Sequence, residues 1–373
     1  MVQTNSVQTF TETRGKIPTT LIVGKVIVRV LSDKDLRYVG NMEKQLTYKK
    51  LIQNMVETLL IDSETVRSNI DPSNLVNQIE EGFANEHRGK AYNPEREQIS
   101  TGERSEILSM PARLADGSVG MKWVSDFLDN EDAPPVMGTV IYNDKRDGKP
   151  LAIIDGTELT RIRTGCAAAI GSKYLTDKKP SSIGIIGLGA QSEEVLRYHG
   201  EIFDLDTIYA SDIDDSAYEE FVQKFEQEYD IRRCEGTECI KKSDAITTVT
   251  PTTSPIINSA TPPTHINALG ADMPQKQEIS KSVLSDPETT LVTDDKRQSK
   301  TGGEFSSILE SNTVNLSEIQ KLGHIIDDEK LADQLKSNLT VFDSTGLGIQ
   351  DVVSARMVYE SVDKDQCQTF EFF

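Results

Sequence analysis

The sequence predicts an α/β fold spread over two domains, and two observations carry this prediction. The chain has 373 residues, which exceeds the roughly 100–200 residues of one ordinary domain. From Ile183 onward, short apolar strand patterns alternate with helix patterns. Such alternation is typical of a parallel sheet whose strands are joined by crossover helices.

The segments before Ile183 mix helix patterns with strands that adjoin one another along the chain. Residues 19–31 are rich in β-branched side chains and are expected to form a strand, after which Ser32 resembles a helix cap. The other segments expected here are helices at 43–61, 72–88 and 158–174, strands and turns at 94–123, and two strands within 139–154 around the turn Asp147-Gly148.

The segments after Ile183 supply the parallel sheet. A polar linker, 177–182, precedes them. Strands are predicted at 183–186, 207–211, 245–249, 265–269, 291–293 and 339–342, and helices at 192–203, 216–229 and 349–362.

Composition excludes several classes of partner. The net charge of −20 argues against nucleic acid or an anionic membrane, since both attract a cationic surface. No apolar run approaches the ~20 residues of a membrane span. The first seventeen residues are polar and lack the apolar stretch of a signal peptide. We therefore expect a cytoplasmic protein.

The four cysteines do not predict a disulfide framework or a metal site. Cys234 and Cys239 lie near each other in sequence, but no second pair or histidine cluster completes a zinc site. We expect all four, Cys166 and Cys367 included, to be ordinary reduced thiols.

A glycine turn opens the first candidate site. The strand 183–186 leads into Gly187-Leu188-Gly189-Ala190-Gln191, and a helix pattern follows. Glycines let the backbone approach a pyrophosphate, and the helix N-terminus supplies N–H donors. The next strand ends at Asp212, whose carboxylate can bind a ribose 2′-OH and would repel a 2′-phosphate. These residues predict a Rossmann-type site for NAD rather than NADP. The alternative is a structural turn with Asp212 as a helix cap.

Two cations form the second candidate site. Lys122 lies in an apolar strand, and Arg163 lies in a helix beside small residues. A buried cation needs an anionic partner, and a substrate carboxylate would serve. The alternative for each is an ordinary surface or salt-bridged position.

The third candidate site is the run 265–272, in which an expected strand ends in a turn that presents Asp272. Ligands of open α/β sheets lie beyond the carboxyl ends of the strands, so Asp272 could exchange protons near a nicotinamide. The alternative is a turn-forming aspartate.

Taken together, these motifs resemble the ornithine cyclodeaminase/μ-crystallin family, from about Leu31 to the end of the chain. The stretches that carry the resemblance are 121–124 (MKWV), 163–168 (RTGCAA), 187–192 (GLGAQS), 265–272 (HINALGAD) and 342–351 (FDSTGLGIQD). Some of them look most like archaeal alanine dehydrogenases, whereas the 189–192 turn and residues 245–250 look equally like ornithine cyclodeaminase.

The resemblance implies a fold and a role for particular residues. The fold is a Rossmann domain, 161–339, plus a discontinuous α+β domain for substrate binding and homodimerisation, 1–160 completed by 340–373. Asp272 would be the acid/base, with Lys122 also catalytic. Substrate would contact Arg96, Lys122, Arg163 and Thr345. The NAD contacts implied are Thr139, Arg163, Gly187, Gly189, Ala190, Gln191, Asp212, Thr250, Ile266, Asn267, Ala268, Leu269, Lys276 and Ser344.

The resemblance also implies an activity with several variants. The first is NAD-dependent, alanine dehydrogenase-like oxidation of a small L-amino acid. Ornithine cyclodeamination, reduction of a cyclic imine, and non-catalytic binding of NAD or another ligand are the alternatives.

The chain departs from the family pattern in four places. The residues before Leu31 are additional, 42–68 resembles an inserted helix, and the loop 125–135 is altered. The archaeal enzymes also carry an arginine where this chain has Leu108-Ser109. Arg96, Arg104 or Arg113 could take its place.

Overall fold

The computed structural model describes residues 20–23, 26–29, 57–102, 104–127, 129–130, 132–262, 264–271, 273 and 275–372. The chain divides into two compact units. One comprises residues 1–57 and 371–373, and the other comprises Thr58–Phe370. In the first unit, β1 (Thr20–Val23) and β2 (Val26–Arg29) pair antiparallel. The prediction of a single strand over 19–31 is therefore wrong, because the chain reverses between the two halves of the apolar run.

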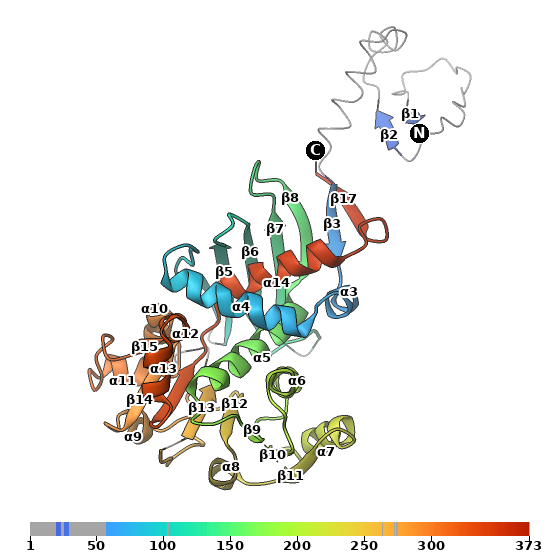
Figure 1. Cartoon of the computed structure of the whole chain (residues 1–373). Helices are drawn as coiled ribbons and strands as arrows, with labels where there is room; N and C mark the ends of the chain where they lie inside the picture. The colour runs from blue at the N-terminus through green and yellow to red at the C-terminus, as the bar shows by residue number, and fades with distance from the viewer. Residues whose placement is uncertain are drawn as a thin grey trace. The chain divides into compact units, whose positions relative to one another are not determined.

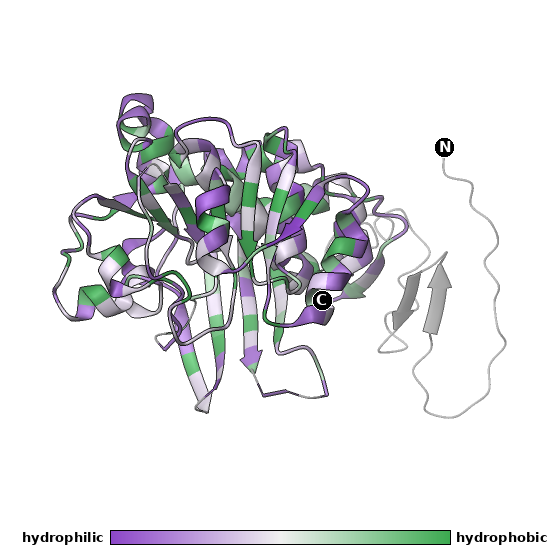
Figure 2. Cartoon of the chain, turned by 90° about the horizontal axis from the view of Figure 1, so that it is seen from below, coloured by the Kyte–Doolittle hydropathy of each residue, from purple (hydrophilic) through white to green (hydrophobic). Residues whose placement is uncertain are grey.

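One sheet of the larger unit is mostly antiparallel, with the strand order β17-β3-β8-β7-β6-β5-β4. Every second residue of β5 and β6 is buried, so one face of the sheet packs against the core. Figure 2 shows hydrophobic and hydrophilic residues alternating along the strands. The strands are β3 (Glu57–Ile61), β4 (Glu97–Gly102), β5 (Ser105–Arg113), β6 (Val119–Phe127), β7 (Val136–Asn143), β8 (Pro150–Asp155) and β17 (Gln368–Glu371).

Helices α4 (Pro72–His87) and α14 (Gly348–Ser361) lie along this sheet, and α14 packs directly on β5, β6 and β7 (Figure 1). The helix predicted at 72–88 is confirmed. Residues 57–61 of the helix predicted at 43–61 form β3 instead, and the rest of that prediction lies outside the described residues. The cause is tertiary, since β3 pairs parallel with β8 and buries Leu59 and Ile61. Of the inserted helix predicted at 42–68, only α3 (Ser63–Ser68) is a described helix.

The second sheet is parallel throughout its described pairs, with the strand order β11-β10-β9-β12-β13-β16-β14-β15. The α/β fold and the parallel sheet with crossover helices are confirmed. The strands are β9 (Ser182–Ile186), β10 (Thr207–Ser211), β11 (Asp230–Arg233), β12 (Ala245–Thr248), β13 (Thr264–Ala268), β14 (Thr289–Thr293), β15 (Gln320–Lys321) and β16 (Leu339–Asp343). The helices are α6 (Ser192–Ile202), α7 (Asp215–Phe225), α8 (Gly236–Lys242), α9 (Lys281–Leu284), α10 (Lys296–Thr301), α11 (Ser306–Glu310), α12 (Leu322–Asp327) and α13 (Glu329–Leu335).

Helix α5 (Gly156–Leu175) touches elements of both sheets. It contacts β7 on one side and β13 and α6 on the other. Its central residues, 162–172, are all buried. At Gly165 a Cβ atom would collide with the backbone of Glu194 in α6, so glycine permits the close approach of the two helices. The third glycine of the usual fingerprint permits close packing of a helix on its strand, and here that position is Ser192.

The structure corrects the prediction of four reduced thiols. Cys234, just after β11, and Cys239, in α8, form a disulfide, with their Cα atoms 5.7 Å apart. Cys166 and Cys367 are free. No helix among the described residues combines the length and apolar character needed to cross a membrane.

Candidate active site

A buried ion cluster joins the antiparallel sheet to α5 and α14. Lys122 Nζ donates to Asp351 Oδ1 at 2.9 Å and to Thr160 Oγ1 at 3.2 Å. Arg163 Nε donates to the same Asp351 oxygen at 3.2 Å, and its Nη1 donates to Gln350 Oε1 at 3.3 Å. Lys122 is only 1% exposed and Asp351 is fully buried. One carboxylate therefore faces two cations, and the cluster keeps a net positive charge.

Opposing effects set the pKa of Lys122. Burial, together with the positive charges of Arg163 and Arg96, lowers the pKa of Lys122 to about 8, although the charge of Asp351 opposes this shift. The structure thus brings Arg96 into electrostatic contact with Lys122. Of the other two candidates, Arg104 pairs with Asp129 near the surface, and Arg113 lines a separate pocket. Arg96 is the best placed of the three to complete an anion site.

Asp351 is a residue that the sequence analysis named only as part of a motif. Its Oδ2 is buried and has no hydrogen-bond partner among the described residues, and the same holds for Gln350 Nε2. An acceptor and a donor thus remain beside two cations. The signal that could have revealed Asp351 is an acid in α14, whose other residues are mostly apolar and buried.

A turn after β16 places Thr345 beside this cluster. Asp294, itself buried, accepts hydrogen bonds from Thr345 Oγ1 at 2.6 Å and from the N–H groups of Thr345 and Gly346. Burial raises the pKa of Asp294, and these hydrogen bonds oppose that shift. Gly346 has φ +80°, and a Cβ there would lie 2.7 Å from Arg163 Nη1. The turn therefore lies directly against the Arg163 guanidinium.

The glycine turn lies at the carboxyl end of β9, where the strand order reverses between β9 and β12. Ligands of open α/β sheets bind at this point. Gly187 has φ +95°, and a Cβ there would lie 2.6 Å from the Val249 carbonyl oxygen. The Leu188 N–H donates to Asp212 Oδ2 at 2.6 Å. Asp212 thus lies beside the turn, as a ribose-binding carboxylate requires.

The rim of the turn leaves room for a phosphate. Gly189 and Ala190 are exposed, and a Cβ at Gly189 would meet no atom within 4 Å. Two of the implied NAD contacts, Gln191 Oε1 and Ser344 Oγ, are buried and have no hydrogen-bond partner among the described residues. Buried polar atoms without partners are unfavourable unless a ligand satisfies them, so these residues fit a dinucleotide.

Two further turns at this end of the sheet share one carboxylate. Glu278 accepts hydrogen bonds from Thr250 N at 2.7 Å, Thr250 Oγ1 at 2.8 Å and Gly270 N at 2.8 Å. Burial raises the pKa of Glu278, and the hydrogen bonds from these turns oppose the shift. The turns after β12 and β13 are thereby held together by a residue that the sequence analysis did not single out.

Several candidate residues lie in the core of the strands. Ile266, Asn267 and Ala268 are buried in β13, and the Asn267 side chain is bonded to Ser172, Thr247 and His265. Leu269, the fourth residue of this run, is half-buried after β13, and its N–H donates to the Thr248 carbonyl oxygen at 2.9 Å. The Asn267 side chain therefore holds the strand in place rather than facing a ligand.

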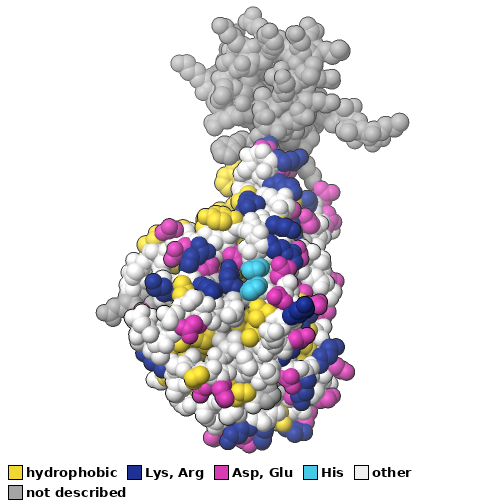
Figure 3. All heavy atoms as spheres, turned by 60° about the vertical axis from the view of Figure 1, so that its left-hand side comes forward, with side chains coloured by type: hydrophobic (Ala, Val, Ile, Leu, Met, Phe, Trp, Pro, Cys, Tyr) yellow, Lys and Arg dark blue, Asp and Glu magenta, His cyan; other side chains and the backbone are white. Residues whose placement is uncertain are grey.

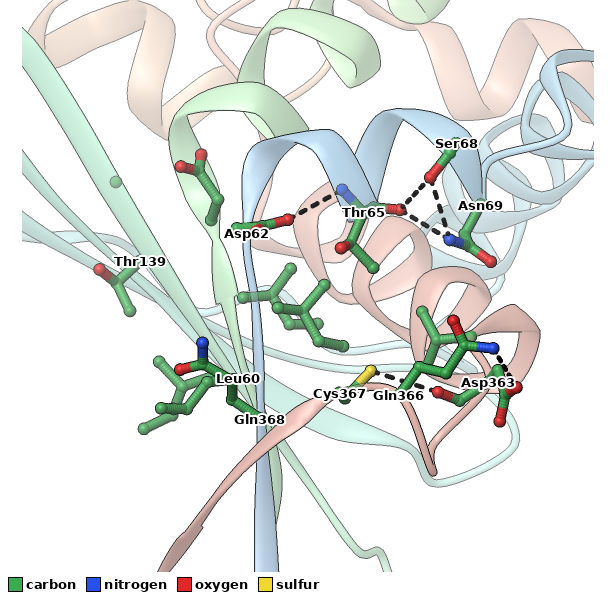
Figure 4. A pocket seen from close by; sticks show the side chains of 16 residues that line it. Leu60, Asp62, Thr65, Ser68, Asn69, Thr139, Asp363, Gln366, Cys367 and Gln368 are labelled. Atoms are coloured by element: carbon green, nitrogen blue, oxygen red, sulfur yellow. Dashed lines mark hydrogen bonds between the residues drawn. The ribbon is translucent and has the colours of Figure 1, made fainter.

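Thr139 is not brought to the other candidates. It lies on β7 and lines a separate pocket of about 820 Å³, together with residues of β3, α3 and the segment after α14. Figure 4 shows Thr139 in this pocket with Leu60, Asp62 and Gln368. None of the other candidate residues lines it. Lys276 is buried, whereas Asp272 lies outside the described residues.

No group of His, Cys, Asp and Glu side chains in the described part of the chain is arranged to hold a metal ion.

The comparisons with known proteins agree with this geometry. An alanine dehydrogenase from Archaeoglobus fulgidus is 34% identical over 85% of this chain and 99% of that enzyme. A solved archaeal alanine dehydrogenase dimer with bound NAD superposes with a TM-score of 0.78 at 33% identity, covering 85% of this chain and all of that one. The Δ(1)-pyrroline-2-carboxylate reductase of Thermococcus litoralis, solved with NADH and L-proline, gives a TM-score of 0.77 at 26% identity over 82% and 97%.

The family model that matches is the ornithine cyclodeaminase/mu-crystallin family, over residues 56–366. This match covers the parallel sheet and all of the antiparallel sheet except β17, and it includes every candidate residue discussed above. The chain therefore belongs to the ornithine cyclodeaminase/mu-crystallin family.

Proposed function

We propose that the chain is an NAD-dependent oxidoreductase that acts at the α-carbon of a small L-amino acid, in the manner of an alanine dehydrogenase. The reaction is L-alanine, NAD⁺ and water to pyruvate, ammonium, NADH and a proton, and it is reversible. The observation that carries the proposal is the buried cluster of Lys122 and Arg163, which adjoins the turn after β16 through Gly346.

The cations supply carboxylate binding. Arg163 can present its remaining N–H donors to a substrate carboxylate, and Arg96 adds positive charge from β4's side of the cluster. Lys122 Nζ can donate to the carboxylate or to the oxygen that develops at the α-carbon, where a positive charge stabilises the transition state. Asp351 Oδ2 can accept from an amino group or from water.

The dinucleotide would be held by the turns at the carboxyl end of the parallel sheet. Residues 187–191 would face the pyrophosphate, Asp212 the adenosine ribose, and Ser344 and Thr250 the nicotinamide half. When bound, NAD supplies the hydride acceptor. Asp212 favours NAD because a carboxylate repels the 2′-phosphate of NADP. The acid/base role of Asp272 rests on the sequence motif alone.

The likeness to a pyrroline-carboxylate reductase solved with NADH and L-proline favours a second candidate, reduction of a cyclic imino acid. The same cations would bind its carboxylate, but no ammonia would be consumed. Ornithine cyclodeamination is the third candidate, and it would release ammonia without net formation of NADH.

One panel separates these activities. NADH oxidation is followed with pyruvate, with and without ammonium, and with Δ(1)-pyrroline-2-carboxylate, while ornithine is followed by product analysis. We expect ammonium-dependent NADH oxidation with pyruvate. Absence of turnover with pyruvate and other small 2-oxo acids would remove the alanine dehydrogenase proposal. Asp272→Asn should abolish turnover and spare NAD binding.

We also propose a homodimer, since the archaeal relative was solved as a dimer with bound NAD. The antiparallel sheet leaves large apolar side chains on its outer side, among them Trp123 and Ile99 at 42% and 56% exposure. A partner subunit would cover them. Light scattering at micromolar concentration is expected to give twice the 41.4 kDa mass of one chain, and a monomeric mass would contradict the proposal.

A further inference from the structure

A cationic pocket lies apart from the cluster of Lys122 and Arg163. It has a volume of about 360 Å³ and lies between the end of α4, the end of β5 and the start of α10. Its charged lining consists of Arg113, Lys296, Arg297 and Lys321, with Glu86 and Asp295 as the acids. On the face drawn in Figure 3, Lys and Arg side chains gather beside histidine side chains. Four cations around one pocket are unusual in a chain with a net charge of −20.

Each of the two acids already pairs with a cation of the protein. Asp295 accepts two hydrogen bonds from the Arg297 guanidinium, at 3.1 and 2.5 Å, and Glu86 pairs with Lys321. Arg113 donates to the carbonyl oxygen of Leu114 at 3.4 Å. Among the described residues, neither Lys296 nor Arg113 has an acidic partner. The lining therefore carries excess positive charge.

The lysines also disfavour each other's charge. Partial burial and the positive charge of Lys321 both lower the pKa of Lys296. Two ammonium groups held near each other are stabilised when an anion binds between them. The volume lies at the lower end of the range for small-molecule pockets, which suits a small anion better than a nucleotide.

The pocket is connected to the candidate active site by direct contacts. Arg297 Nη2 donates to the carbonyl oxygen of Asn93 at 2.9 Å. The Asn93 side chain accepts from the N–H of Ile349 at 3.3 Å, in the first turn of α14, next to Gln350 and Asp351. Lys296 directly precedes Arg297 in α10 and lines the same pocket, so an anion bound by Lys296 would act through α10 on the residue that holds the start of α14.

We propose that this pocket is an effector site for a small doubly charged anion, held chiefly by Lys296 with support from Arg113 and Lys321. The anion is either a phosphate or a short dicarboxylate, since both offer two negative charges within the span of the pocket. The binding site itself does not depend on the proposed function, whereas its effect on catalysis rests on that function.

The test is calorimetric titration of the full chain with inorganic phosphate and, separately, with succinate. Both are run at about 20 mM ionic strength, because salt screens exposed charges. Lys296→Ala is the test variant and Lys300→Ala is its control, since Lys300 lies in the same helix outside the pocket. Loss of one charge-assisted hydrogen bond should weaken binding about tenfold in the first variant and leave it unchanged in the second.

The outcomes separate the site from its effect. The site is supported if either anion binds saturably and if Lys296→Ala weakens that binding while Lys300→Ala does not. The anion that binds shows whether the ligand is a phosphate or a dicarboxylate. No saturable binding of either anion, or equal weakening by both variants, would overturn it. Thermal midpoints of the variants check folding. In steady-state assays, phosphate or succinate should change KM in the wild type and not in Lys296→Ala, and an unchanged KM would overturn the effector role.

Discussion

At the scale of the residue, Asp351 explains how two cations can lie buried side by side. Its Oδ1 accepts from both Lys122 and Arg163, which offsets part of their repulsion in a region closed to solvent. Because one carboxylate faces two cations, the cluster keeps positive charge for a substrate anion. Removal of Asp351 would leave two buried cations without their shared carboxylate, which is strongly unfavourable.

The pKa of Lys122, about 8, predicts how activity depends on pH. Lys122 is charged below this value and loses its proton as the pH rises through it. We expect kcat/KM for the amino or oxo acid to fall above about pH 8, since kcat/KM follows the ionisation of the free enzyme. A profile that stays flat to pH 10 would show that the charge of Lys122 is not used.

Replacing Asp351 by asparagine should shift the alkaline limb of the pH profile, which is the pH range in which kcat/KM falls. Asp351 opposes the lowering of the Lys122 pKa, so Asp351→Asn should shift the alkaline limb to lower pH by about one unit. At neutral pH, kcat/KM should fall by about two orders of magnitude, as for the loss of a buried positioning charge. Asp363→Asn, just beyond α14, is the control. A fall in kcat/KM with an unmoved limb would mean that Asp351 has a structural role only.

Asp212 carries the prediction for cofactor choice. Its carboxylate accepts from Leu188 N–H and Asp214 N–H, which fixes it beside the glycine turn. Asp212→Ser removes the charge that repels a 2′-phosphate. We expect the ratio of kcat/KM for NADP to that for NAD to rise at least about tenfold, which corresponds to about 1.4 kcal/mol. Asp204→Ser, in the exposed segment before β10, is the control and should leave the ratio unchanged. An unchanged ratio in Asp212→Ser would show that Asp212 does not contact the ribose.

At the scale of the element, the carboxyl ends of β12 and β13 depend on a residue from the segment between β13 and α9. Glu278 accepts from both following turns, at Thr250 and at Gly270. It is a positioning residue, because it acts through the backbone of the turns. Glu304 in turn accepts from the N–H groups of Glu278 and Ile279, and burial raises its pKa to about 9. Buried acids thus arrange this edge of the sheet.

Glu278→Gln tests this arrangement. A glutamine presents N–H donors to turns that themselves donate, so the turns should separate. We expect KM for NAD to rise about tenfold, the loss of roughly one hydrogen bond to a charged group, with a smaller change in kcat. The exposed Glu288→Gln is the control. Equal losses in kcat and in thermal stability, with KM for NAD unchanged, would show a purely structural role.

The elements that sequence could predict are those whose own residues decide their structure. The strands β9, β10, β12, β13 and β16 are apolar runs bounded by polar turns, and each was predicted to within a residue or two of its observed ends. The segments β11, α8 to α13, β15 and β17 were missed because they are short and carry no clear hydrophobic period. The sequence pattern of residues 57–61 favours a helix, whereas the structure has strand β3 there, because its partner β8 is remote in sequence.

The candidate site divides along the same line. Sequence can predict those candidates whose neighbouring residues form a recognisable pattern, namely the glycine turn, Asp212, Lys122 and Arg163. Asp351, Glu278 and Asp294 act by accepting from residues that are remote in sequence, such as Lys122, Thr250 and Thr345. Thr139, to which the resemblance assigns a cofactor contact, lines another pocket, and that contact stays a prediction. The Cys234–Cys239 disulfide also required knowledge of how α8 follows β11.

At the scale of the whole molecule, a buried polar chain crosses between the layers. His199 of α6 contacts Ser172 of α5, which accepts from Asn267 of β13. Asn267 contacts His265, which reaches Thr340 of β16. Burial lowers the pKa of His199 to about 4 and that of His265 to about 3, so both rings are neutral in the folded protein. Helix α5, which also contacts the antiparallel sheet, is tied to the parallel sheet by this chain.

Acid should therefore weaken the fold through these histidines. In the unfolded chain a histidine binds a proton below about pH 6.5, whereas buried His265 stays neutral down to about pH 3. The unfolded state thus binds more protons in this window, and stability falls as the pH drops through it. The raised pKa of Asp343, about 7, and of Glu304, about 9, act in the opposite sense over the same window. The effect must therefore be measured as a difference between variants.

His265→Gln isolates this contribution, because glutamine can keep a hydrogen bond to Asn267 or Thr340 and does not titrate. The free energy of unfolding is measured in urea at pH 7 and pH 5. The wild type should lose about 2 kcal/mol more than the variant between these values, which is one proton over about one and a half pH units. His324→Gln, which removes a histidine outside the buried chain, should lose as much as the wild type. If His265→Gln and the wild type lost equal stability on acidification, His265 would have to be charged in the folded protein, and the chain from α6 to β16 could not be neutral.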